Sequence, residues 1–178
     1  LVWLTASNFG GVRHGFSTRL GGVSPAPCDS LNLRPGMGDG REALLENYRR
    51  FCAALQIDIE RTVLSRQVHE TNVRVCTEDD AGKGLFRELE YDSAYALITN
   101  VPGLVLIVFS ADCGTVLLHA PDTGAIGAAH AGWRGCAGGI VAKIVREMRR
   151  CYGVRPERLQ AALGPCISRC CFETDEDV

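Results

Sequence analysis

The residues best suited to chemistry are one cysteine and two histidines, Cys113, His130 and His69. His130 lies in "GAAHAGWRG", residues 127–135, where small residues let backbone or ligand approach closely. A cysteine beside a histidine can act as a nucleophile with its general base. The same pair can instead hold a metal such as zinc, and a third ligand nearby favours the metal.

A predicted β-hairpin brings Cys113 close to His130. Two β-rich runs, 116–120 and 125–130, are joined by "PDTG", whose early proline and final glycine are typical of a turn. If the last residue of the first run pairs with the first residue of the second, Thr115 lies opposite His130. Directly opposite residues have Cβ atoms about 5 Å apart. Cys113 just precedes the first strand, so we expect its thiol to meet the imidazole at the open end of the hairpin.

The other histidines differ in their relation to this pair. His69 ends the β-rich run 62–69, and a histidine in a loop at a strand end can point into a cleft, so it is the candidate third ligand. The hairpin register places His119 about 13 Å from His130, which excludes it. We expect His14 to be structural.

The remaining pattern predicts an α/β fold with mixed sheets. Helices are expected over 41–56, with Asp39 as the cap, and over 138–152, with Gly153 at its end. Strands are expected over 62–69, 72–77, 104–111, 116–120, 125–130 and 161–164, and a charged loop over 79–93. Strands and helices do not alternate strictly, which favours a mixed sheet over a purely parallel one.

Composition indicates the number of domains, the kinds of partner and the location to expect. The 178 residues suit a single domain, 1–178, and are 46% hydrophobic and 22% charged with a net charge of −2. We therefore expect neither nucleic acid nor a membrane as a partner, and the apolar run 101–109 is too short to span a bilayer. Nine cysteines, an odd number without scaffold spacing, favour reduced thiols and a cytoplasmic location.

Several motifs resemble the YfiH/FAMIN family, also called laccase-like. The matching segments, in order, are "HGFSTRLGGVS" at 14–24, "SLNL" at 30–33, "ENYRRF" at 46–51, "QVHETNV" at 67–73, "ADC" at 111–113, "GAAHAGWRG" at 127–135 and "LGPCIS" at 163–168. The resemblance implies a layered α/β/β/α fold shared with a cysteine hydrolase. It also implies a purine nucleoside phosphorylase that cleaves adenosine, inosine, guanosine and methylthioadenosine with phosphate, and that deaminates adenosine.

The resemblance further implies one catalytic zinc ion held by His69, Cys113 and His130. The chain departs from the family pattern at Glu70, where glycine is usual. It departs again at Thr115, where proline is usual, with Gly114 before it. Family members continue for several tens of residues beyond the "LGP" motif, so the C-terminal part of the domain is expected to be missing here.

Four residues are candidates for binding phosphate or substrate. Arg134 is expected where the chain turns into the 138–152 helix, whose N-terminus attracts anions. Arg19 and Ser17 lie in "STRLGG", a second group of donors, and Asn32 lies in "SLNL". Asn32 also suits a turn.

Two other functions remain open. The first is a metal-independent cysteine amidohydrolase of the peptidoglycan-precursor editing type, in which Cys113 attacks and His130 is the base. The second is a zinc-containing protein that binds a metabolite without turnover. A multicopper oxidase is disfavoured because its copper sites need more histidines than the four present.

Overall fold

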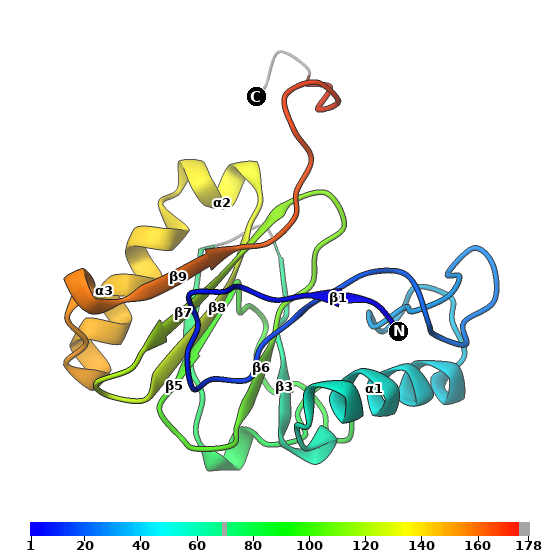
Figure 1. Ribbon diagram of the computed structural model, residues 1–178, viewed down its shortest axis with the longest axis horizontal. Helices are drawn as coiled ribbons and strands as arrows, with labels where there is room; N and C mark the ends of the chain where they lie inside the picture. The colour runs from blue at the N-terminus through cyan, green and yellow to red at the C-terminus, as the bar shows by residue number, and fades with distance from the viewer. Residues whose placement is uncertain (69–70, 175–178) are drawn as a thin grey trace.

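The computed structural model, which describes residues 1–68 and 71–174, stacks a helix, a sheet, a second sheet and a second helix (Figure 1). In chain order the strands and α-helices are β1 (Trp3–Leu4), β2 (Phe16–Ser17), α1 (Arg41–Leu55), β3 (Thr62–Leu64), β4 (Val73–Val75), β5 (Ala96–Thr99), β6 (Val105–Ile107), β7 (Gly114–Ala120), β8 (Ala125–Ala131), α2 (Trp133–Ala137), α3 (Ile140–Tyr152) and β9 (Gln160–Leu163). Short 3-10 turns lie at Ile59–Arg61, Glu78–Asp80 and Pro156–Arg158.

The larger sheet has five strands in the order β4-β5-β8-β7-β9, and one of its faces is covered by α3. Only the β4–β5 pair is parallel, so the sheet is mixed, as expected. Helix α3 turns Ile140, Ile144 and Met148 toward the sheet, and all three are fully buried. Their spacing of four residues places them on one helix face. At Gly127 of β8 a Cβ would lie only 3.0 Å from Ile144, so glycine allows the helix to sit close to the strand.

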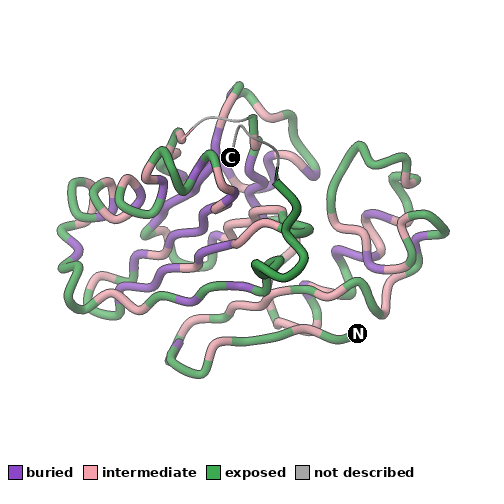
Figure 2. Tube along the Cα trace, turned by 90° about the horizontal axis from the view of Figure 1, so that it is seen from above, coloured by how far each residue is buried: buried purple, intermediate pink, exposed green. Residues whose placement is uncertain are grey.

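The smaller sheet, β3 and β6 in parallel, lies between the larger sheet and α1. Strand β5 shows how the layers are joined, because its side chains alternate between faces. Ile98 packs with the α3 cluster, whereas Leu97 packs with Val63 of β3. On the outer side of the small sheet, Leu64 packs against Tyr48 of α1. Figure 2 shows the buried residues concentrated along the strands. The expected α/β/β/α layering is therefore confirmed.

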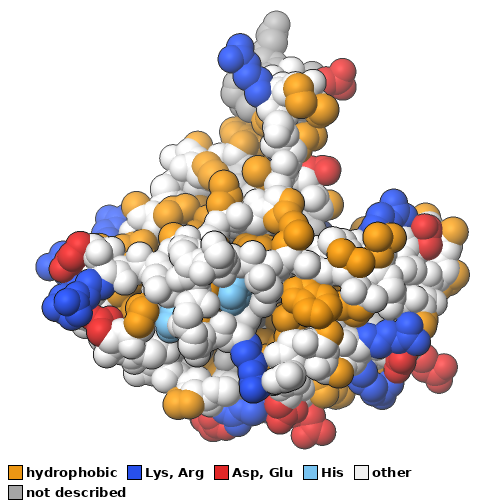
Figure 3. Space-filling view, viewed as in Figure 1, with side chains coloured by type: hydrophobic (Ala, Val, Ile, Leu, Met, Phe, Trp, Pro, Cys, Tyr) orange, Lys and Arg blue, Asp and Glu red, His pale blue; other side chains and the backbone are white. Residues whose placement is uncertain are grey.

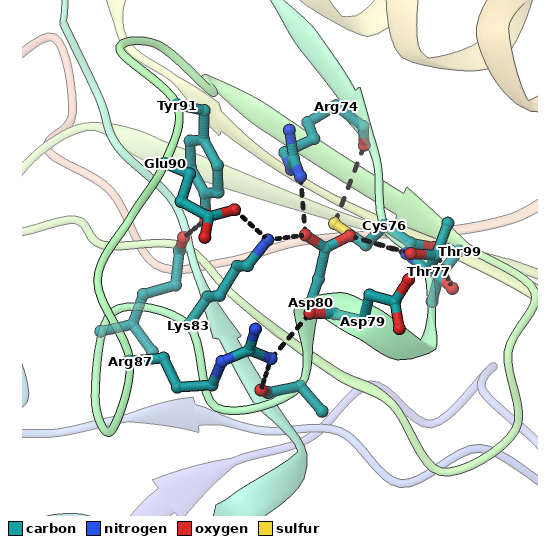
Figure 4. Close-up of polar contacts among 12 residues, drawn as sticks. Arg74, Cys76, Thr77, Asp79, Asp80, Lys83, Arg87, Glu90, Tyr91 and Thr99 are labelled. Atoms are coloured by element: carbon teal, nitrogen blue, oxygen red, sulfur yellow. Dashed lines mark hydrogen bonds and ion pairs between the residues drawn. The ribbon is translucent and has the colours of Figure 1, made fainter.

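A buried polar cluster around Asp80 fixes the chain between β4 and β5 (Figure 4). The Asp80 carboxylate accepts hydrogen bonds from Arg74 (2.6 Å), Lys83 (3.1 Å) and the backbone N–H of Thr77 (2.8 Å). Lys83 also pairs with Glu90 at 2.9 Å. Burial by itself raises the pKa of Asp80, but these hydrogen bonds outweigh it and lower the pKa to about 2. The charged segment 79–93 is thus an ordered loop with a buried ionic anchor.

The structure corrects one expected cap and several element boundaries. Helix α1 begins after Gly40, and Asp39 is not its cap. The Asp39 carboxylate instead accepts hydrogen bonds from Ser24 (2.5 Å) and Asn32 (3.3 Å), which tie the preceding loop together. The expected helix over 138–152 is α3, which begins at Ile140, and a separate short helix that was not expected, α2, precedes it across a bend at Gly138 and Gly139. In the described part of the chain, no helix combines the length and apolarity needed to cross a bilayer.

Candidate functional site

The β7–β8 hairpin has the expected register, which places His130 at its open end. Ala120 pairs with Ala125, and Thr115 lies opposite His130. Strand β8 lies between β5 and β7, so His130 is buried by strands on both sides and is 9% exposed. At the other end of the hairpin, His119 lies opposite Ile126 and its Nδ1 is 2.9 Å from the side chain of Gln160.

Cys113 and His130 face the same small space beside Gly132. Cys113 comes directly before β7, and Gly132 comes directly after β8. A Cβ placed on Gly132 would lie 3.0 Å from His130 Nε2 and 3.1 Å from Cys113 Sγ. A thiol and an imidazole nitrogen thus face one point from the two sides of the hairpin's open end, and only a residue without a side chain leaves that point open.

The surroundings of His130 select one tautomer of its ring. The Nδ1 atom lies 2.8 Å from the carbonyl oxygen of Phe109. A carbonyl can only accept a hydrogen bond, so Nδ1 carries the hydrogen and Nε2 carries the lone pair. The ring also packs edge-on against Tyr95, with ring centroids 5.1 Å apart. The nitrogen able to bind a metal or take up a proton is therefore the one that faces Cys113.

The surroundings of Cys113 favour the neutral thiol when no metal is bound. Burial raises the pKa of the Cys113 thiol, and Asp112, Cys136 and Cys166 raise it further. A cysteine that acts as a free nucleophile normally has a lowered pKa, set by nearby positive charge or a helix N-terminus. A metal cation bound at the sulfur would favour the thiolate instead.

His69, the expected third ligand, and Glu70 lie outside the described residues. Gln67 and Asn72, which lie on either side of this pair in the sequence, are hydrogen-bonded to segments that contact His130. On one side, Gln67 bonds both backbone groups of Phe109. On the other, the carbonyl of Asn72 accepts from the N–H of Tyr95, whose own carbonyl accepts from the N–H of His130. Across residues 1–68 and 71–174, no three His, Cys, Asp or Glu side chains are grouped to hold a metal ion.

Three of the four expected phosphate or substrate residues line one large cavity. Its volume is about 1640 Å³, and its walls include Ser17, Arg19 and Asn32 as well as the segment 109–112 that leads to Cys113. Figure 3 shows hydrophobic side chains at the surface between the larger sheet and α1. The cavity exceeds the volume of a typical ligand pocket, so a small substrate would occupy only part of it.

The two expected arginines lie in different surroundings. The Arg19 guanidinium donates to the carbonyl and the carboxylate of Asp29, each at 2.9 Å, and is largely exposed. The guanidinium of Arg134 stacks on the ring of Trp133 at 4.1 Å. Arg134 belongs to the five-residue helix α2, not to the N-terminus of the longer helix, and it does not line the cavity described above. Asn32 supports a turn, as expected, because its side chain bonds both backbone groups of Arg34.

Two contributors to the site were not found from sequence patterns. Gln67 carries no charge and stands two positions before His69, so its place in "RQVH" was the only available signal. Phe109 acts through its backbone carbonyl, which no residue type reveals.

The fold and the site together define the class of protein: an α/β/β/α domain with a Cys–His pair at the open end of a buried hairpin. The profile of the family described as "Multi-copper polyphenol oxidoreductase laccase" matches residues 13–178. A solved structure of YfiH from Bacillus licheniformis superposes with a TM-score of 0.84 at 35% identity, covering 92% of this chain and 61% of that one. The chain therefore belongs to this laccase-like family, which includes YfiH.

Curated relatives carry names from purine nucleoside chemistry. "Purine nucleoside phosphorylase YlmD" of Geobacillus stearothermophilus is 36% identical over 99% of this chain and 65% of its own. "Purine nucleoside phosphorylase" of Deinococcus radiodurans is 40% identical over 94% of this chain and 61% of its own. "Adenosine deaminase RL5", from an unknown prokaryotic organism, is 34% identical over 92% of this chain and 63% of its own. The chain thus spans just under two thirds of the length of each of these relatives.

Proposed function

We propose that residues 1–178 form a catalytic domain of a zinc-dependent purine nucleoside enzyme. Its reactions are the phosphorolysis of adenosine, inosine, guanosine and methylthioadenosine, and the deamination of adenosine. The observation that carries the proposal is that the phosphorylase- and deaminase-named relatives match over more than nine tenths of this chain. The nine cysteines are all free thiols, which supports a cytoplasmic location.

The metal ligands in this proposal are His69, Cys113 and His130. Two nitrogens and one thiolate sulfur form a donor set that zinc prefers, and three protein ligands are typical of catalytic zinc sites. The bond from His130 Nδ1 to the Phe109 carbonyl is the outer contact that ligating histidines usually make. Zinc bound there would supply a Lewis acid that polarises substrate or activates water.

The substrate in this proposal enters the large cavity from the side of Ser17 and Arg19. Phosphorolysis breaks the bond between ribose C1′ and the purine nitrogen. A phosphate oxygen bonds to C1′, and the base leaves with a proton. The Arg19 guanidinium and the Ser17 hydroxyl would bind the phosphate, and Asn32, which lines the same cavity, would contact the substrate. Deamination consumes water and releases ammonia, so it does not need this phosphate subsite. Arg134, on the other side of the hairpin end, is the alternative phosphate ligand.

The main rival function is a metal-free amidohydrolase with Cys113 as the nucleophile and His130 as its base. The two side chains face each other as such a pair requires. Against this rival, burial and then Asp112 raise the pKa of the Cys113 thiol, whereas reactive cysteines normally have a lowered pKa. In the other rival, a zinc-containing metabolite-binding protein, the same ligands would bind zinc without turnover.

Metal analysis combined with nucleoside turnover tests the proposal. The purified chain should contain about one zinc per molecule. With phosphate it should convert adenosine to adenine and ribose 1-phosphate, and without phosphate to inosine and ammonia. Chelation should abolish both reactions, and added zinc should restore them. Turnover that survives complete removal of metal would favour the amidohydrolase, and zinc binding without turnover would favour the binding protein.

The two arginines can be separated by matched variants. If Arg19 binds phosphate, R19A should lower phosphorolysis at least tenfold and leave deamination nearly unchanged, because only the first reaction uses phosphate. R134A provides the direct comparison at the alternative position. Equal losses of both activities in either variant would indicate a structural role for that arginine.

A further inference from the structure

The side chain of Gln67 is bonded to both backbone groups of one distant residue, Phe109. Its Nε2 donates to the Phe109 carbonyl at 2.9 Å, and its Oε1 accepts from the Phe109 N–H at 2.8 Å. The hydroxyl of Ser65 donates to the same Oε1 at 2.8 Å. The primary amide therefore has its donor and its acceptor directed at one peptide segment, which is a geometrically specific arrangement.

This contact extends the small sheet beyond the last backbone pair. Strands β3 and β6 pair in parallel as far as Leu64 and Ile107, and the N–H of Ser65 then donates to the Ile107 carbonyl at 2.9 Å. Two residues further along each chain, the Gln67 amide takes the place of a backbone group and holds Phe109. Phe109 is thereby held at the position where β6 ends and the chain turns toward Cys113.

The Phe109 carbonyl links this clamp to the Cys–His pair. The same oxygen accepts from Gln67 Nε2 and from His130 Nδ1, at 2.9 and 2.8 Å. Phe109 also begins the short segment that ends at Cys113, where the Ser110 hydroxyl donates to the Cys113 carbonyl. One side chain thus holds the acceptor that orients His130 and the start of the segment that carries Cys113.

We propose that Gln67 is a positioning residue of this centre: its amide fixes the Phe109 carbonyl, which keeps His130 in the Nδ1–H tautomer with Nε2 directed toward Cys113. The metal-binding consequence rests on the proposed function, whereas the tautomer and its dependence on Gln67 do not. Outer contacts of this kind typically contribute 10–100-fold to metal affinity.

Two substitutions distinguish positioning of the His130 ring from a purely structural role of Gln67. Q67E keeps the shape and keeps an acceptor for the Phe109 N–H. It loses the donor to the Phe109 carbonyl and places a negative oxygen against that carbonyl instead. Q67A removes both bonds. A matched control is Q160E, because Gln160 bonds the ring of the other hairpin histidine, His119, at 2.9 Å.

The experiment is long-range 1H–15N NMR of the histidine rings in the metal-free chain, followed by zinc titration against a competing chelator. Wild-type His130 should show the Nδ1–H tautomer. In Q67E its ring should become a mixture of tautomers, and zinc affinity should fall 10–100-fold with cooperative thermal unfolding retained. Q160E should move the His119 signals, leave those of His130 in place, and change zinc affinity less than twofold.

Unchanged His130 tautomer in both Gln67 variants would overturn the proposal, and so would zinc affinity equal to that of Q160E. If Q67A does not fold, Q67E decides alone. If the wild-type chain binds no zinc, the proposed function fails, and the tautomer measurement still decides the role of Gln67.

Discussion

The Sγ of Cys113 and the Nε2 of His130 face one point from opposite sides of the hairpin end, 3.1 and 3.0 Å from the position of a Cβ on Gly132. The two residues are not directly opposite in the register, since Thr115 occupies that position. They meet because the chain leaves β8 through a residue without a side chain. The space between them is therefore a feature of the backbone, and it can be tested by filling it.

G132A should lower zinc affinity and activity while leaving the fold intact. The backbone φ of Gly132 is −70°, which alanine adopts without strain. The new methyl group would sit against both reactive atoms, and crowding of this kind costs about 1–3 kcal/mol. About 1.4 kcal/mol corresponds to tenfold in affinity, so competitive zinc titration should show a loss of roughly tenfold or more. G10A is the control, because nothing lies within 4 Å of a Cβ there. Equal zinc binding by the two variants would contradict a site across this space.

The two hairpin histidines should respond differently to removal. H130A removes a ring that faces Cys113, so the variant should lose zinc and nearly all turnover. H119A removes a buried ring bonded to Gln160, which should cost about 1–3 kcal/mol of stability and leave zinc content unchanged. Metal analysis and thermal unfolding of both variants provide the measurement. Loss of zinc in H119A would mean that the hairpin does not separate the two rings.

The sequence predicted the elements that carry a strong local pattern. The alternation and turn chemistry of 116–130 were sufficient to define the hairpin register, because shifting the register by one residue would move every side chain to the opposite face. Helix α3 was recognisable from the spacing of Ile140, Ile144 and Met148. Its end at Gly153 was also predicted, since the φ of +66° there favours glycine.

Contacts between distant segments could not be predicted from local patterns. Asp39 precedes α1 as a cap would, yet its carboxylate bonds Ser24 and Asn32 from the loop before it. The acceptor of the His130 ring is the backbone carbonyl of Phe109, and every residue has such a group. The chain segment 104–111 was expected to form one long strand. It pairs only over Val105–Ile107, because Phe109 is held by the side chain of Gln67 and not by a backbone partner.

The Asp80 cluster predicts a specific loss of stability in acid. The pKa of Asp80 is about 2 in the folded chain and near 4 when unfolded. Its contribution is therefore present above about pH 4 and is lost as the pH falls through about 2, a change of about 2–3 kcal/mol. D80N should not show this loss of unfolding free energy in acid. It should be about 3 kcal/mol less stable at pH 7, because Arg74 and Lys83 lose a buried partner.

Urea unfolding at pH 7 and at several pH values below 4 measures both effects of the Asp80 substitution. D79N is the control, since the neighbouring Asp79 is exposed and its substitution should change stability by less than about 0.5 kcal/mol. A D80N chain as stable as D79N would show that the cluster contributes nothing.

Alkylation of Cys113 distinguishes a metal ligand from a free nucleophile. In zinc-loaded protein the thiolate is bound, so iodoacetamide should react slowly at Cys113, and chelation should speed the reaction. Even in the metal-free chain the reaction at pH 7 should be slow and should rise with pH, because burial and then Asp112 raise the pKa of the thiol. D112N removes one of these causes and should speed labelling of the metal-free chain at pH 7.

C113S should lose zinc and activity together, since a hydroxyl is a far weaker zinc ligand. Mass spectrometry must locate the label, because the chain has nine cysteines. Fast labelling of Cys113 in zinc-loaded protein, with turnover that persists after chelation, would establish the amidohydrolase in place of the zinc enzyme.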